Sequence, residues 1–132
     1  MRIEGWESLL SEYIEQSRHV EFEWGMNDCA LWAADWVKLA TGNDFASQWR
    51  GLYTSEAELE QLMAERELEL PTDIADDVGL PQMHVAFAQR GDIVLHPQGC
   101  LGICNGVHSH FLMERGVTRL RTRDCLKAWR VA

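Results

Sequence analysis

The sequence lacks long apolar runs and has few basic residues. It nowhere has about 18 consecutive apolar residues, which predicts that no helix spans a membrane. Its start, MRIEGWESLL, has no basic stretch followed by an apolar run, so we expect no signal peptide and folding in the cytoplasm. Lys and Arg total 12 against 21 Asp and Glu, and the net charge of −9 argues against free nucleic acid as a partner.

The sequence also lacks a Cys-x-x-Cys pair. Its cysteines are Cys29, Cys100, Cys104 and Cys125, and in a cytoplasmic chain we expect them to be free thiols. The run CLGICNG is typical of a strand that enters an Asn-Gly turn, and extended residues four apart lie about 13 Å from each other. Cys100 and Cys104 therefore cannot share one ion, and we expect no metal and no cofactor.

Length and composition predict one globular domain over residues 1–132, because 46% of residues are hydrophobic, 25% are charged, and neither a repeat nor a linker is visible. The acidic charge is concentrated in residues 55–77, which hold nine acids and one base. We interpret this stretch as a solvated helix face exposed along Glu56, Glu60 and Glu67. The alternatives are docking to a basic protein surface and mimicry of DNA.

Apolar periodicity predicts two helices near the N-terminus. The spacing i, i+3, i+4, i+7 predicts an amphipathic helix over residues 4–18. Residues 29–40 are apolar nearly all round, with Asn27 or Asp28 to cap the start and Gly42 to end the helix. This second segment is expected to be the central buried helix.

The rest of the chain changes from helical to extended patterns. Ser55 and Glu58 form a capping box for a third helix that ends near residue 66, and residues 71–81 are expected to be rich in loops. Four strands bounded by turn residues are then predicted: 92–96, 100–104, 107–113 and 117–121. A last short turn leads into CLKAWRV. Helices followed by a strand meander predict an α+β fold.

Cys29 is the candidate nucleophile. A cysteine in the first turn of a helix lies at the positive end of the helix dipole, which favours the thiolate. Asp28 works partly against that effect. Because cysteine is also a common buried residue with no chemical role, the assignment depends on whether a base is brought to it.

Motifs spread along the chain carry a resemblance to a known family. They are WGMNDC (24–29), ADW (34–36), RGDIV (90–94), LGI (101–103) and AWRV (128–131). Their order and spacing resemble NlpC-type papain-like peptidases that cut bacterial cell-wall peptides. They are closer to small proteins encoded among phage and prophage tail genes. The resemblance implies a papain-like (NlpC-type) α+β domain, with N-terminal helices packed on a C-terminal antiparallel sheet.

The sequence departs from the peptidase pattern at the catalytic base. Active members carry a histidine immediately before the Leu-Gly-Ile strand, where this chain has Cys100. A thiol neither orients nor shuttles a proton near neutral pH as imidazole does. His96 does not align with the missing base. The resemblance implies a vestigial catalytic site made of Cys29 and His110, in which His110 takes the orienting position if the hairpin loop is residues 105–107. The alternative is that His110 is a surface or core residue without a role in the site.

The hairpin at Asn105 and Gly106 decides where His108 and His110 point. If these two residues form the loop, both histidines lie on the sheet face opposite Cys100. If the loop is one residue longer, both come to the Cys100 face. The sequence leaves both registers open.

The resemblance implies a structural or assembly component of a phage tail, at the tail tip. Such a component binds other tail proteins without turnover, is made in the host cytoplasm, and is then incorporated into the virion. The alternative is an active cysteine endopeptidase or amidase acting on peptidoglycan peptides, with Cys29 as nucleophile and His110 or a neighbour as base. A third interpretation is an acidic inhibitor or adaptor of a host protein.

Overall fold

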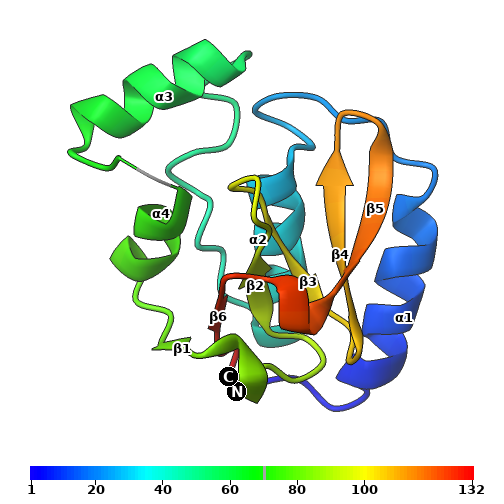
Figure 1. Cartoon of the computed structure of the whole chain (residues 1–132). Coiled ribbons are helices and arrows are strands. Elements are labelled where there is room, and N and C mark those ends of the chain that lie inside the picture. The colour runs from blue at the N-terminus through cyan, green and yellow to red at the C-terminus, as the bar shows by residue number, and fades with distance from the viewer. Residues whose placement is uncertain (70) are drawn as a thin grey trace.

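The computed structural model describes residues 1–69 and 71–132 of an α+β fold (Figure 1). In these residues the helices come first: α1 (Trp6–Ser17), α2 (Cys29–Thr41), α3 (Glu56–Glu65) and α4 (Pro71–Asp77). The strands follow: β1 (Gln82–Met83), β2 (Ile93–Leu95), β3 (Leu101–Cys104), β4 (His108–Met113), β5 (Gly116–Arg121) and β6 (Lys127–Trp129). Two short 3₁₀ turns are η1 (Val85–Phe87) and η2 (Thr122–Asp124). The predicted α+β class is confirmed.

The strands form one antiparallel sheet with the order β1-β6-β2-β3-β4-β5. The predicted meander from β2 to β5 is confirmed, and each strand end lies within one residue of its predicted position. The sequence did not predict β6, which returns to lie between β2 and β1. A strand of three residues is too short to show alternation, and its partners are distant in sequence.

The predicted caps of the central helix are confirmed. Asp28 is the N-cap of α2, and its carboxylate accepts a hydrogen bond from the Leu31 amide. Gly42 ends the helix with φ 82°, a left-handed conformation that glycine adopts without strain. Local chemistry in the sequence is therefore enough to bound this helix.

The acidic segment contains α3 as predicted. The Ser55 hydroxyl caps this helix by accepting from the Glu58 amide at 3.1 Å. Glu56, Glu60 and Glu67 are exposed, as expected for a solvated face, and residue 70 of the segment lies outside the described residues. Whether this surface docks to a partner stays open.

The expectation that residues 71–81 are loop-rich is wrong for the first part of that segment, which forms α4. Proline is well suited to the first turn of a helix, where its missing N–H has no intrahelical partner. Ala75 of this helix is buried in the main core beside the sheet. Packing of Ala75 in the core stabilises this helix. The proline and glycine residues of the segment predicted turns and gave no sign of that packing.

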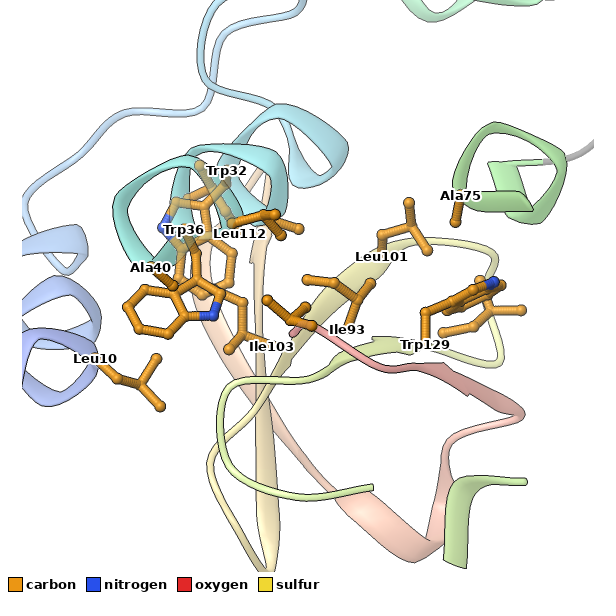
Figure 2. Close-up of a cluster of buried hydrophobic side chains, with 14 residues drawn as sticks. Leu10, Trp32, Trp36, Ala40, Ala75, Ile93, Leu101, Ile103, Leu112 and Trp129 are labelled. Atoms are coloured by element: carbon orange, nitrogen blue, oxygen red, sulfur yellow. The ribbon is translucent and has the colours of Figure 1, made fainter. Parts of the chain in front are cut away.

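The main core lies between one face of the sheet and the first two helices (Figure 2). Trp32 and Trp36 of α2 pack there with Ile103 of β3, and Leu10 contributes from α1. A smaller cluster on the opposite face contains Phe111 and is flanked by the short 3₁₀ turns. The first two helices thus cover one face of the sheet, and α2 packs against β3 and β4.

Both hairpin registers considered from the sequence are wrong. Ile103 pairs with His110, and the Asn105 amide donates to the His108 carbonyl at 2.8 Å, so the loop is Gly106 and Val107. Gly106 has φ 98°, a conformation that the first position of a two-residue hairpin loop favours in glycine. Compared with the first alternative, which pairs residue 103 with residue 108, the pairing is shifted by two residues, so each side chain stays on the same face of the sheet. His108 and His110 consequently lie on the face of Ile103, opposite Cys100, as in the first alternative.

Candidate functional site

The aspartate of the WGMNDC motif is part of the scaffold that holds Cys29. Asp28 is buried, and its second carboxylate oxygen accepts from the Gly25 amide at 3.0 Å and from the Tyr53 hydroxyl. Burial first, and then this hydrogen bond, raise the pKa of Tyr53, which therefore remains a donor. A Cβ at Gly25 would lie 1.9 Å from the Tyr53 carbonyl oxygen. The motif thus fixes the loop that delivers Cys29 to the start of α2.

Cys29 and Cys100 meet at the rim of the sheet. Cys29 is the first residue of α2, and Cys100 directly precedes β3. The two thiols are close enough for each to shift the acidity of the other. Both are partly exposed and line one open hollow of about 370 Å³, together with Phe22, Trp24 and other residues. The structure therefore brings the predicted nucleophile to the same hollow as Cys100, the position at which the resemblance leads us to expect a histidine.

The contact between the thiols changes the acidity of both. The hydrogen bond with Cys100 raises the pKa of Cys29 well above its usual value, and burial and the Asp28 carboxylate add to the effect. The same hydrogen bond lowers the pKa of Cys100. The expected benefit of the helix dipole for a Cys29 thiolate is thus outweighed. In this pair Cys29 is the donor, and Cys100 is the sulfur that ionises first.

Among the described residues that line this hollow there is no histidine. His110 instead lines a separate hollow with Arg18, the C-cap of α1, and Arg119 of β5. Burial, and then the charges of Arg119 and His108, lower the pKa of His110. His96 packs edge-on against a phenyl ring of β4, with 4.9 Å between the ring centroids. The structure thus does not bring His110 to Cys29.

The Gly-Asp motif before β2 forms a clasp between the two ends of the chain. Asp92 is fully buried, and its carboxylate accepts from Arg2 Nη2 at 2.8 Å and from the Val131 amide at 3.0 Å. Arg130 Nε lies 3.3 Å from its other oxygen. Figure 1 shows the two termini side by side. This motif stabilises the fold and lies apart from the residues that line the cysteine hollow.

Two other motifs also serve packing. A Cβ at Gly102 would lie 2.3 Å from Phe111 Cδ1 and 2.4 Å from the His110 carbonyl oxygen, so only glycine fits in β3. Asp35 of the ADW motif pairs with Arg50 at 2.5 Å. The sequence did not reveal the roles of Tyr53 and Arg2, because each bonds to an aspartate that is far away in the chain. Of the motif residues, Cys29 is the one that faces the hollow with a reactive group.

The described residues contain no group of three or more His, Cys, Asp or Glu side chains placed to hold a metal ion. Cys104 lies at the far end of β3 from Cys100, and its sulfur is 3.5 Å from the Gly106 carbonyl oxygen. All the cysteines are free thiols. Within the described part of the chain, no helix is long and apolar enough to cross a membrane.

Comparisons with known proteins place the chain in one family. Neither the curated proteins nor the solved structures include a match. One family profile, described as a domain of unknown function (DUF6950), matches residues 1–131. Because that match covers nearly the whole chain, the protein belongs to the DUF6950 family.

Proposed function

We propose that this protein is a structural or assembly component of a phage tail, at the tail tip, built on a papain-like domain that has lost its catalytic base. The observation that carries the proposal is the pairing of Cys29 with Cys100 in a hollow whose described lining has no histidine. The tail assignment itself rests on the resemblance of the motifs to small tail-gene proteins. The domain then acts by binding other tail proteins.

The chemistry of the hollow supports binding over turnover. Acyl transfer by a cysteine needs a base that takes the thiol proton and returns it to the leaving amine, a contribution of about 10²–10⁴-fold in rate. Cys100 accepts a hydrogen bond from Cys29 but raises the pKa of that thiol. A protonated Cys29 is a weak nucleophile. We therefore expect no cleavage that matters during cell entry.

The placement of the other motifs supports a role based on surface recognition. The carboxylates of Asp28 and Asp92 accept hydrogen bonds from within the protein. Position 102 must be glycine because a side chain there would clash with β4. These residues stabilise the shape of the domain and take no part in chemistry. A papain-like domain of this kind would be synthesised in the host cytoplasm and retained in the virion as part of the tail.

One observation favours the alternative, a cysteine endopeptidase or amidase that acts on peptidoglycan peptides. The backbone amide of Leu101 is hydrogen-bonded to Cys29 and acts to lower the pKa of that thiol. A backbone donor beside a nucleophile is the kind of group that stabilises an oxyanion. In this alternative Cys29 attacks the peptide carbonyl, and a base must come from outside the described lining of the hollow.

The test compares wild type, Cys29→Ala and His110→Gln on purified peptidoglycan and follows newly released amino groups. We expect no release above background from any of the three proteins. Release by wild type that is lost in Cys29→Ala would establish the peptidase alternative. Release that also needs His110 would show that this histidine reaches the site by a rearrangement.

A second experiment tests the tail role directly. Deletion of the gene is expected to stop assembly of infectious particles, and complementation with Cys29→Ala is expected to restore it. Complete tails in the deletion strain would overturn the structural role. Rescue by wild type alone, with folded Cys29→Ala inactive, would show that the thiol itself is needed.

A further inference from the structure

The two thiols come from distant parts of the chain and line the same open hollow. Cys29 is held by the start of α2, and Cys100 by the start of β3. Both residues line the same hollow, both are partly exposed, and each thiol shifts the acidity of the other. We propose that Cys29 and Cys100 form a reversible intramolecular disulfide by exchange with a small-molecule disulfide. The inference does not depend on the tail assignment, because it concerns only these two thiols.

The reaction is two successive thiol–disulfide exchanges. The Cys100 thiolate attacks one sulfur of the small disulfide, so the S–S bond of the reagent breaks and one small thiolate leaves. Cys29 then loses its proton to solvent or to that thiolate and attacks Cys100 Sγ, which expels the second small thiol. Overall, the two cysteine thiols are oxidised to one disulfide, and the small disulfide is reduced to two small thiols.

The environment assigns different roles to the two residues. The hydrogen bond from Cys29 makes Cys100 the more acidic thiol, so Cys100 is the attacking residue. Cys29 lies beside it and is the resolving residue. Since both residues line the same hollow and α2 packs on β3, closing a bond of about 2.05 Å calls for a rearrangement of these two side chains.

The other two cysteines lack this arrangement. Cys104 is fully buried in the second core cluster, and its sulfur lies 3.7 Å from Thr122 Oγ1. Cys125 is buried as well, and burial raises the pKa of its thiol to about 11. Both are therefore expected to stay reduced, and they serve as internal controls.

The charges around the hollow indicate which reagent should react faster. Glu56 and Glu114 line it with a single arginine, Arg115. This excess of carboxylates disfavours an anionic disulfide such as oxidised glutathione. The uncharged disulfide of mercaptoethanol is therefore the probe of choice, and oxidised glutathione is the comparison.

The test treats the reduced, native full-length chain with the mercaptoethanol disulfide, blocks free thiols, and maps the peptides by mass spectrometry. In wild type we expect a Cys29–Cys100 disulfide without a retained adduct, reversed by dithiothreitol. Cys29→Ala is expected to keep one mercaptoethanol adduct on Cys100, because the resolving thiol is gone. In Cys100→Ala we expect Cys29 to react about tenfold more slowly than Cys100 does in wild type, because burial and Asp28 still raise the pKa of Cys29.

Three results would overturn the proposal. They are a stable adduct on wild-type Cys100 that Cys29 does not displace, a disulfide that includes Cys104 or Cys125, and no reaction at Cys100 in folded protein. Circular dichroism of each variant, together with the reduced state of the two buried cysteines, shows that the protein under test is folded. Faster reaction with oxidised glutathione than with the neutral probe would overturn the stated preference for an uncharged disulfide.

Discussion

The indole nitrogen of Trp36 donates a hydrogen bond to the carbonyl oxygen of Gly91 at 2.9 Å. This bond joins the middle of α2 to the turn that precedes β2, and Trp36 is fully buried. Two motifs that the resemblance connects with a catalytic domain are therefore tied to each other in the core. Their shared role is to hold the helix that carries Cys29 against the sheet.

Replacement of Trp36 by phenylalanine tests this bond. Trp36→Phe removes the N–H donor and part of a buried ring, so we expect the free energy of unfolding to fall by about 2 kcal/mol. The measurement is urea denaturation followed by circular dichroism. Trp24→Phe is the matched control, since Trp24 is only half-buried, and it should cost clearly less. Equal losses in the two variants would show that the hydrogen bond to Gly91 adds nothing.

Substitution at the Asp92 clasp is expected to lower the free energy of unfolding by more than Trp36→Phe does. Asp92→Asn keeps the size of the side chain but removes the charge that faces Arg2, and it leaves that guanidinium partly buried without its counter-ion. We expect unfolding to become easier by about 3 kcal/mol. Asp44→Asn is the control, because Asp44 pairs with Arg50 at 3.1 Å near the surface, where a pair contributes at most about 1 kcal/mol. A smaller loss for Asp92→Asn than for this control would contradict the clasp.

Gly102 is expected to be intolerant of any side chain. Gly102→Ala places a methyl group against the Phe111 ring and the His110 carbonyl oxygen, and we expect a loss of about 3 kcal/mol in stability, measured in urea. The added change Phe111→Leu should recover only part of this loss, because the backbone carbonyl remains in place. Wild-type stability of Gly102→Ala would show that the two strands separate easily.

His110 predicts a pH dependence of stability. Burial lowers the pKa of His110 in the folded chain from its ordinary 6.5, so the unfolded chain binds the proton more readily. The stabilisation is therefore complete above about pH 6.5 and is lost as the pH falls through the lower, folded-state pKa. His110→Gln should flatten the fall of Tm between about pH 7 and pH 5.

The control for this pH profile is His19→Gln, because His19 is exposed in the turn that follows α1. It is expected to keep the wild-type slope of Tm against pH. An unchanged slope in His110→Gln, with the protein folded, would contradict the effect assigned to burial near Arg119.

The sequence by itself determined the elements whose signals are local. Asp28 and Gly42 bound α2, Ser55 begins α3, and turn residues separate β2 through β5. These signals lie within a few residues of the groups that they satisfy, so no distant contact is needed to interpret them. The position of Cys29 at a helix start is the part of the site that followed from such a signal.

Only the tertiary structure decided the rest, because each remaining feature joins residues that are far apart in the chain. The β3–β4 register depends on which faces of the strands become buried. Residues 127–129 form the strand β6 because they pair with β2, which is distant in sequence. The meeting of Cys29 with Cys100, and the distance of His110 from both, follow from α2 packing on β3. A thiol takes its reactivity from such neighbours, and local sequence does not specify them.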